Sequence, residues 1–351
     1  MALIATSIPA APTGWLDFGL VGRGVREPYR NASVAGTELD LNLSLPLTPY
    51  LEARAGWEAN LESGTNQESL DQKYAPRKTV EIREALIEAK WNWGKIQVGA
   101  LDQSLWGQPI FLTSQTFPAI TETLYWDASP FKMTLLAEQA VASDSTETPF
   151  SIETEKGLPT FSFERLRVES HYAKGSSYVE VSHFLFQNLS FQSALSSQYI
   201  GSPVLGLGDR TRRFTQGFRG WAVNVGTSLE INASLKPSLK IGGLKNSEAL
   251  LASQSVYAQI NLPIEIFPWG TIQPSALWFQ NEAKSVPALY ANSHLGFINR
   301  RGWQIALDIE ASQWGPVFIH AEYVSSQPIQ SSPNQGDFNL MQVGVSHRYA
   351  F

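Results

Sequence analysis

The sequence predicts an all-β protein, a closed antiparallel transmembrane β-barrel of about 16 strands. Three observations predict this fold. Apolar and polar residues alternate with a period of two, the clearest alternating run is about ten residues long, and short connections between runs alternate with long ones. Because a period of two places one kind of side chain on each face of a strand, each run is expected to separate an apolar medium from water.

The clearest run covers 38–47, where Leu fills every odd position and the even positions from Glu38 to Ser44 are polar. After a turn at 46–49, the alternation resumes over 51–61. Two such strands joined by a tight turn form a β-hairpin. Strands of soluble sandwiches average about 5–6 residues, whereas a tilted strand needs about 9–11 residues to cross a membrane. These two runs meet the longer requirement.

The same alternation recurs along the rest of the chain, at 16–20, 96–100, 165–169, 223–231, 235–241, 255–262, 303–310, 317–323 and 341–351. The segment 79–93 is ambiguous, because Ile82, Leu86 and Trp93 have helical spacing and the Glu, Ala and Lys content favours a helix. We predict a strand with a β-bulge around 84–86, which reverses the apolar phase. A strand here also preserves the alternation of connections downstream.

The connections between runs are of two kinds. Short ones fall near 46–49, 93–94, 127–130, 174–177, 232–233, 263–270 and 312–315. Long, polar ones rich in Gly, Ser and Pro fall near 24–36, 62–77, 102–120, 142–160, 188–216, 244–252, 281–300 and 325–337. Seven short and eight long connections imply sixteen strands with both termini at the short-turn end. We expect one barrel domain over 1–351, with 1–13 as a short N-terminal segment.

Composition excludes several other classes of protein. The 351 residues include no Cys, which excludes a Cys-ligated zinc site, a thiol nucleophile and a redox pair. The formal net charge of −6 argues against nucleic acid as a partner. No apolar run approaches about 18 residues, so no transmembrane helix is predicted. A mean hydropathy of −0.15 is modest for a membrane protein, and a barrel explains it because the lumen and loops are polar.

The first twelve residues contain Ala and Pro but lack the positive start and the apolar stretch of a secretory signal. We interpret them as a mature N-terminus whose signal has been removed, with an ordinary cytoplasmic start as the alternative. The aromatic residues favour the membrane reading, since amphipathic rings belong at the two membrane interfaces. Those at or beside short turns are Tyr50, Trp91, Trp93, Trp126, Trp269 and Trp314. The alternative is that aromatic residues fill a soluble core.

The last strand, 338–351, ends in an apolar and aromatic row that includes Val343, Val345, Tyr349 and Phe351. It resembles the C-terminal assembly signal of Gram-negative outer-membrane β-barrel proteins. This resemblance implies an outer-membrane location, short periplasmic turns, long extracellular loops, and recognition of Tyr349 and Phe351 by the barrel-assembly machinery.

A second resemblance lies in the Arg-Glu-Ala run at 83–85 and the Trp-Gly pair at 106–107, which are similar to an early segment of many bacterial porins. Porins commonly trimerise, so the resemblance implies a homo-oligomer. The other expected partners are membrane lipid, lipopolysaccharide and small hydrophilic solutes.

Barrel diameter grows with strand number, and about 16–18 strands leave an aqueous channel. The expected function is therefore passive diffusion of small hydrophilic solutes and ions. The alternative is a structural barrel that forms a homo-oligomer with occluded lumens. No enzyme, metal or cofactor is predicted, because His171 and His320 lie on polar faces without an evident Ser or Asp partner.

Polar positions of the strands supply the predicted pore lining: Asp40, Glu52, Arg54, Glu58, Arg165, Arg167, Glu169, Glu230, Lys240, Asp308, Glu322 and Arg348. Rings of fixed charge bias which ions enter a pore. Since the signs are mixed, strong selectivity is not expected, and the acidic excess suggests a slight preference for cations. The alternative is that these charges pair across strands and only keep the lumen wet.

Two long connections are candidates for further roles. The segment 102–120 resembles in position the third loop of general porins, which folds inward, and its candidate constriction residues are Asp102, Trp106, Phe111 and Phe117. It carries almost no charge, so it would act by size and apolarity. The segment 188–216 carries Arg210, Arg212 and Arg213, which could bind phosphate or carboxylate groups bidentately. The alternative for this cluster is a solvated basic loop.

Overall fold

Strands dominate the part of the chain that the structure describes. The computed structural model describes residues 11–28, 30–67, 74–103, 108–112, 115–142, 157–206, 211–266, 269–311, 316–332 and 334–351. The barrel strands are β1 (Thr13–Glu27), β2 (Arg30–Thr48), β3 (Leu51–Asn66), β4 (Lys78–Trp91), β5 (Gly94–Asp102), β6 (Thr116–Ala128), β7 (Phe131–Val141), β8 (Thr160–Tyr172), β9 (Gly175–Gln187), β12 (Phe218–Leu229), β13 (Ser238–Asn246), β14 (Gln254–Asn261), β15 (Ile264–Ile266), β16 (Gly270–Asn281), β17 (Arg300–Ala311), β18 (Val317–Pro328) and β19 (Phe338–Ala350).

The long connections contain a few short elements. These are helix α1 (Phe191–Tyr199), the small hairpin β10 (Val204–Leu205) and β11 (Arg213–Phe214), and the 3₁₀ helix η2 (Ala288–Tyr290). Among the described residues, no helix has the length and apolarity needed to span a membrane.

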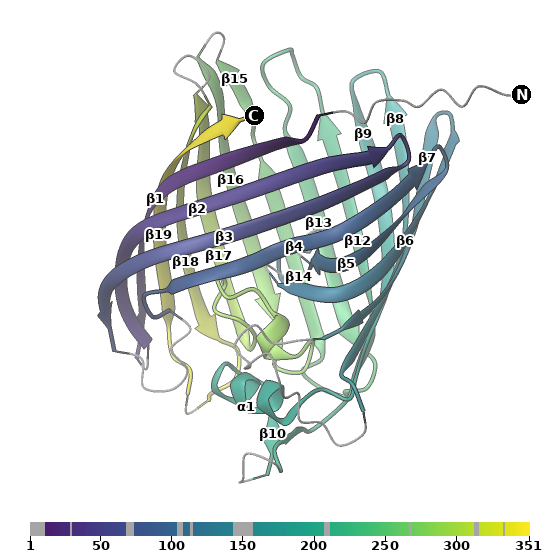
Figure 1. Cartoon of the computed structure of the whole chain (residues 1–351). Helices are drawn as coiled ribbons and strands as arrows, with labels where there is room; N and C mark the ends of the chain where they lie inside the picture. The colour runs from purple at the N-terminus through teal and green to yellow at the C-terminus, as the bar shows by residue number, and fades with distance from the viewer. Residues whose placement is uncertain are drawn as a thin grey trace, which may run out of the picture.

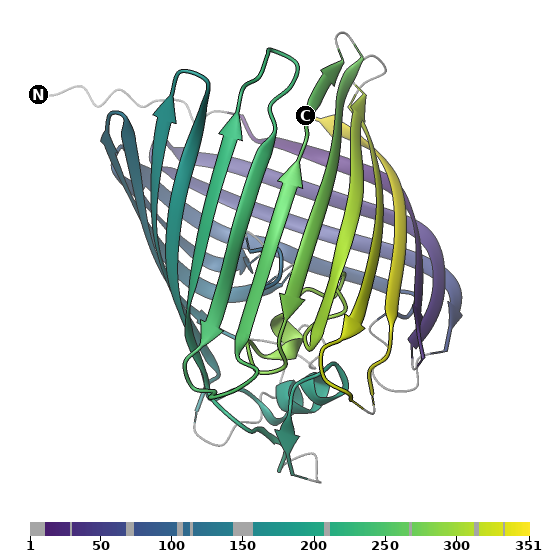
Figure 2. The same ribbon diagram turned by 180° about the vertical axis from the view of Figure 1, so that it is seen from behind.

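The strands form one closed antiparallel barrel (Figures 1 and 2). β9 pairs with β12, and β1 pairs with both β2 and β19, so the sheet has no free edge. β14 and β15 both pair with β16 and are the two parts of one interrupted strand, which gives sixteen strands around the barrel. The predicted fold class and strand number are confirmed.

The short turns, the start of β1 and the C-terminus gather at one end of the barrel, and the long connections lie at the other (Figure 1). The predicted long loop at 24–36 is wrong. β1 continues to Glu27 and β2 begins at Arg30, where the two side chains form a 2.7 Å ion pair. Val25 and Val34 point inward and are buried in an apolar core inside the barrel. The strands continue here because this internal packing, which the Gly- and Pro-containing sequence did not reveal, supports both of them.

The ambiguous segment 79–93 is a strand, as predicted. The register between β3 and β4 shifts where Gly56 lies opposite Glu84 and Trp57 lies opposite Ile82. Arg83 is therefore the extra residue of a β-bulge, one position before the predicted 84–86. The bulge changes the phase of the inward and outward positions and turns Arg83 toward the acidic residues of β2 and β3.

Candidate pore and its lining

The predicted pore-lining residues lie mainly on the inward face of the wall, which alternates with outward apolar residues such as the exposed Leu39 and Leu45 of β2. Inward strand positions hold Asp40, Glu52, Arg54, Glu58, Arg165, Arg167, Glu169, Lys240, Asp308, Glu322 and Arg348. Glu230 differs from the prediction. β12 ends at Leu229, so Glu230 is an exposed residue of the following turn, outside the wall.

Many of these inward charges are paired. Arg54 donates to Glu52 at 2.8 Å and to Glu88 at 3.0 Å, and so joins β3 to β4. Arg167 donates to Glu169 at 3.1 Å on the same strand. Pairs of mixed sign keep the wall polar without producing a strong field of one sign.

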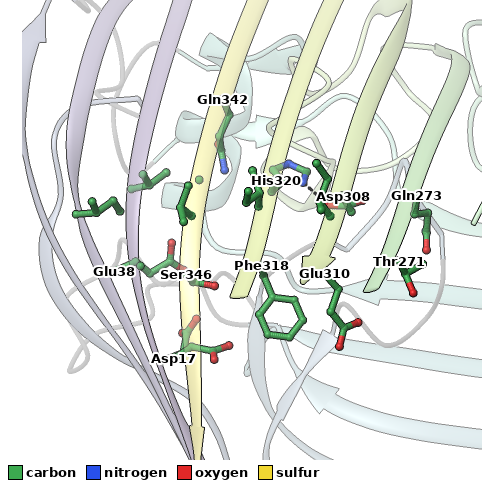
Figure 3. A pocket seen from close by; sticks show the side chains of 18 residues that line it. Asp17, Glu38, Thr271, Gln273, Asp308, Glu310, Phe318, His320, Gln342 and Ser346 are labelled. Carbon is green, nitrogen blue, oxygen red and sulfur yellow. Dashed lines mark hydrogen bonds and ion pairs between the residues drawn. The ribbon is translucent and has the colours of Figure 1, made fainter. Parts of the chain in front are cut away.

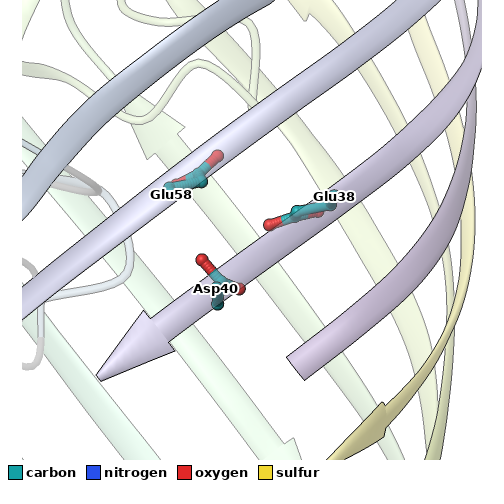
Figure 4. Close-up of side chains that lie close together, drawn as sticks. All are labelled: Glu38, Asp40 and Glu58. Atoms are coloured by element: carbon teal, nitrogen blue, oxygen red, sulfur yellow. The ribbon is translucent and has the colours of Figure 1, made fainter. Parts of the chain in front are cut away.

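An acidic cluster on β2 and β3 is only partly neutralised. The carboxylate groups of Glu38, Asp40 and Glu58 converge (Figure 4), and each offers an oxygen within 4.8 Å of the others. Arg83 hydrogen-bonds to Glu58 and lies 4.0 Å from Asp40. Glu38 has no hydrogen bond or ion pair within the described residues. Carboxylate oxygens attract hard cations, so this part of the wall favours positive charge.

The same cluster borders a hollow of about 280 Å³ in the wall of the lumen. Figure 3 shows the side chains of Asp17, Glu38 and Glu310 around this hollow, contributed by β1, β2 and β17. Asp308 and His320 also line it. The hollow is acidic and open to the lumen, which suits passage of polar solutes better than tight binding of an apolar one.

His320 has a carboxylate partner that the sequence did not reveal. Its Nδ1 lies 2.6 Å from Oδ1 of Asp308, its cross-strand neighbour on β17. His294 lies 2.6 Å from Glu322, which is also within 3.8 Å of His320. A nucleophilic site needs a hydroxyl within hydrogen-bond reach of the imidazole, and neither histidine has such a contact in the described part of the chain.

The long-loop end of the lumen is packed with apolar side chains. Phe111 contacts the rings of Phe161, Phe184 and Phe186, with centroids 5.6–6.4 Å apart. Phe117, on β6, contacts Tyr290 with centroids 5.6 Å apart. We call this cluster of buried apolar side chains the loop core. Its members are Val25, Ala32, Val34, Tyr74, Ile110, Phe111, Leu112, Phe117, Leu136, Ala140, Ala142, Phe161, Phe163, Phe184, Phe186, Ile200, Phe218, Ala222, Leu244, Tyr257, Leu277, Phe279, Val286, Ala288, Leu289, Tyr290, Ala291, Leu295, Phe297, Ile298, Val324, Phe338 and Leu340.

Backbone hydrogen bonds join the connections that build the loop core. Phe111 forms a β-bridge with Ala291, and the N–H of Leu112 donates to the carbonyl of Tyr290 at 2.8 Å. The N–H of Leu289 donates to Ser197 at the end of α1. The connection 282–299 lies within the segment 281–300 that the sequence predicts as a long, polar loop, but it is almost wholly buried. Its low charge and its apolar run from 286 to 291 are the signals that could have revealed it.

Comparison with known proteins bears on the fold. No protein-family model and no curated protein matches the chain. Among solved structures, Pseudomonas putida OprB matches with a TM-score of 0.59 and 11% identity over 97% of this chain and 94% of that one. A loop-deletion mutant of Vibrio cholerae OmpT, an outer membrane protein, matches at 0.56 and 10% over 97% and 98%. The anion-selective porin from Comamonas acidovorans matches at 0.53 and 11% over 97% and 99%.

The chain shares the fold of these outer-membrane barrels. Within this porin fold, Phe111 and Phe117 are buried in the loop core, and Asp102 is the last residue of β5. Trp106 lies outside the described residues. Phe111 and Phe117 suit the predicted constriction by size and apolarity, which stays a prediction. Asp102 does not, because inward Leu101 pairs with Phe117 and Asp102 therefore lies at an outward position of β5.

The predicted basic cluster is divided. Arg213 is the first residue of β11 and is exposed. Arg212 is half-buried, and its Nε and Nη1 have no hydrogen-bond partner within the described residues. Arg210 lies outside the described residues. At the other end of the barrel, Tyr349 and Phe351 are exposed beside the closing seam.

Sequence reasoning missed several inward carboxylates. Glu62, Glu88 and Glu180 are buried in the wall, and Glu38 belongs to the acidic cluster. On β2 and β3 these residues share the even numbering of Asp40 and Glu58, so parity alone could have identified Glu38 and Glu62. Glu180 required the strand to be recognised first, because 178–182 mixes Tyr, Val, Glu and Ser.

Proposed function

We propose that the chain is an outer-membrane porin through which small hydrophilic solutes and ions diffuse passively. The observation that carries this proposal is the closed sixteen-strand wall with ion-paired charges inside and apolar side chains outside. Such a wall lets the backbone N–H and C=O groups of every strand form hydrogen bonds while it separates lipid from water. A channel of this kind needs no catalytic group, metal or cofactor, and none is assigned here.

Within this proposal, the polar path runs beside β3 and β4. These strands contribute nothing to the loop core. Their inward residues at the same end are polar, among them Glu62, which accepts from Arg23 at 3.3 Å, and Arg83. A hydrated ion does not enter a dry apolar core, so the path is displaced from the barrel axis toward this wall.

The test is single-channel recording of the purified chain in planar lipid bilayers. Discrete conductance steps in salt solution, together with uptake of small sugars by proteoliposomes, are the expected results. A chain that inserts into bilayers but passes neither ions nor sugars contradicts the proposal.

The loop core supports a second candidate function, a structural barrel with an occluded lumen. The core receives side chains from most of the strands as well as from the connections 108–112 and 282–299. A variant in which residues 284–297 are replaced by a short Gly-Ser linker separates the two functions. If the unmodified chain is silent and this variant conducts, the lumen is closed by its own loops and the second function holds.

A further inference from the structure

A hollow of about 560 Å³ lies at the base of the connection 188–217, which joins β9 to β12 and contains α1, β10 and β11. α1 and β10 lie at the long-loop end of the barrel (Figure 1). Pockets that hold small molecules have volumes of roughly 300–1,000 Å³. We call this hollow the mouth pocket, and the lining residues that matter here are Phe191, Arg212, Phe214, Gln216 and Phe218.

One part of the mouth pocket is aromatic. Phe186 and Phe218 are cross-strand partners at the ends of β9 and β12, and both belong to the loop core. Phe214 lies against Phe218 with ring centroids 4.9 Å apart and is itself only half-buried. Phe191, the first residue of α1, is also half-buried. The pocket therefore offers ring surface to an apolar group of a ligand.

Another part of the mouth pocket carries hydrogen-bond donors that lack acceptors. Nε and Nη1 of Arg212 are buried and have no hydrogen-bond partner within the described residues. Nε2 of Gln216 is buried without a partner in the same part of the chain. A buried donor without an acceptor is costly, and a buried charged donor more so. Three donor atoms on two residues of one pocket thus lack an acceptor that the described chain does not supply.

The charge of the mouth pocket is positive. Its described lining residues include the guanidinium groups of Arg212 and Arg213 and no carboxylate. Glu248 lies close to Gly217, but it pairs with Arg219 at 2.9 Å. The amino end of α1 borders the pocket, and backbone N–H groups at the start of a helix favour negative charge. The missing acceptor is therefore expected to be an anion.

We propose that the mouth pocket binds a phosphate or carboxylate group that is joined to an apolar body. The anionic group accepts hydrogen bonds from Arg212 and Gln216, and the apolar body packs against Phe191 and Phe214. A free solute and the phosphorylated lipid of an outer membrane both carry this chemistry. The inference goes beyond the proposed diffusion pore, because binding needs the folded mouth of the barrel and not an open lumen.

Isothermal titration calorimetry of the purified chain in a non-ionic detergent tests this inference, with phenyl phosphate as the probe. Phenyl phosphate is expected to bind more tightly than inorganic phosphate, which lacks the ring. Benzamide, which has the ring but no charge, is expected not to bind. If phenyl phosphate does not bind at millimolar concentration, or binds no better than inorganic phosphate, the proposal is overturned.

Arg212→Gln locates the binding site. It is expected to lower the affinity for phenyl phosphate about tenfold or more, because it removes the charged donor. Arg301→Gln is the matched control, since it removes one exposed arginine at the long-loop end of β17 and should leave the affinity unchanged. Equal affinities of these two variants would place the anion elsewhere and overturn the proposal. Arg212→Lys, which keeps the charge but loses the planar donor group, should show a smaller loss and serves if Arg212→Gln does not fold.

Phe214→Ala tests the aromatic part of the pocket. It should lower the affinity for phenyl phosphate and leave that for inorganic phosphate unchanged; equal losses for both probes would contradict the assigned contact with the ring. Competition then identifies the source of the anion. Displacement of phenyl phosphate by purified lipopolysaccharide assigns the pocket to the lipid, and lack of displacement assigns it to a free solute.

None of these measurements uses conductance, so the inference and the proposed function fail separately. A chain that binds phenyl phosphate through Arg212 but passes no ions contradicts the pore and leaves the mouth pocket in place. A chain that conducts ions but binds no probe overturns the mouth pocket alone.

Discussion

Arg348 forms a two-pronged ion pair with Asp17 across the seam between the last strand and the first. Its Nη2 lies 2.7 Å and its Nε 3.0 Å from the carboxylate, and the two residues are direct cross-strand partners. The guanidinium also lies over the rings of Trp15 and Phe318, 4.3 Å and 4.8 Å from their centroids. The residue that helps to close the barrel is thus fixed from three sides, on the lumen side of the wall.

Asp17→Asn is expected to weaken this seam. The change removes the charge of the acceptor and costs about 1 kcal/mol of the free energy of unfolding, since the pair is partly open to water. Urea unfolding in detergent micelles, followed by Trp fluorescence, measures the effect. Glu310→Gln is the matched control, because Glu310 is an inward carboxylate without an ion pair in the described residues. Equal stability of both variants would show that the pair contributes nothing to closure.

A buried chain of hydrogen bonds joins three strands at Asn224. Its amide nitrogen donates to Glu180 at 2.8 Å on β9, and its oxygen accepts from the hydroxyl of Tyr257 at 2.6 Å on β14. Asn224→Leu leaves both partners buried without this contact and is expected to lower the free energy of unfolding by about 3 kcal/mol. The same unfolding assay applies.

Asn339→Leu is the control for that change, because Asn339 accepts one exposed hydrogen bond from Tyr323 at 3.0 Å. Its loss is expected to stay within about 0.5 kcal/mol. If the two leucine variants are equally stable, the buried chain does not hold β9, β12 and β14 together.

The loop core is expected to contribute to stability and to limit conductance at the same time. Phe111→Ala removes a side chain that touches three other rings and should cost about 3–5 kcal/mol. The loosened core should also leave a wider path beside β3 and β4, which should raise single-channel conductance. Val98→Ala on the outer face of β5 is the control, with a smaller loss and unchanged conductance. A destabilised Phe111→Ala variant with unchanged conductance would show that the loop core does not narrow the proposed path beside β3 and β4.

The wall of the barrel could be predicted from the sequence, whereas the packing of the connections inside the barrel could not. Alternation is a one-dimensional signal, so the parity of Leu39 and Leu41 already assigns Asp40 to the inner face. The strand number followed from the alternation of turns. Connections lack such a period, and burial of Val286 and Leu295 depends on side chains from strands far away in the chain.

The wrongly predicted loop, 24–36, also depends on contacts with distant parts of the chain. Glu27 and Arg30 are buried at the mouth, and Arg300 hydrogen-bonds to Glu27 from β17, a contact between residues 273 positions apart. Local Gly, Arg and Pro content indicated a loop, but this long-range pairing extends both strands. Pairing between distant residues leaves no local pattern in the sequence.

The acidic cluster is expected to set the ion preference of the pore. Glu38 is unpaired within the described chain and Asp40 lies 4.0 Å from Arg83, so the wall there carries more negative than positive charge. Glu38→Gln combined with Asp40→Asn should shift the reversal potential, measured across a salt gradient, toward the value expected for an anion-selective pore. The shift should be largest near 0.1 M salt, where the screening length is about 10 Å, and should shrink near 1 M, where it is about 3 Å. Glu265→Gln is the control, because this carboxylate lies at the short-turn rim and already pairs with Lys236 at 3.2 Å. An unmodified pore that prefers anions, or a double variant with an unchanged reversal potential, would show that Glu38 and Asp40 do not face the ion path.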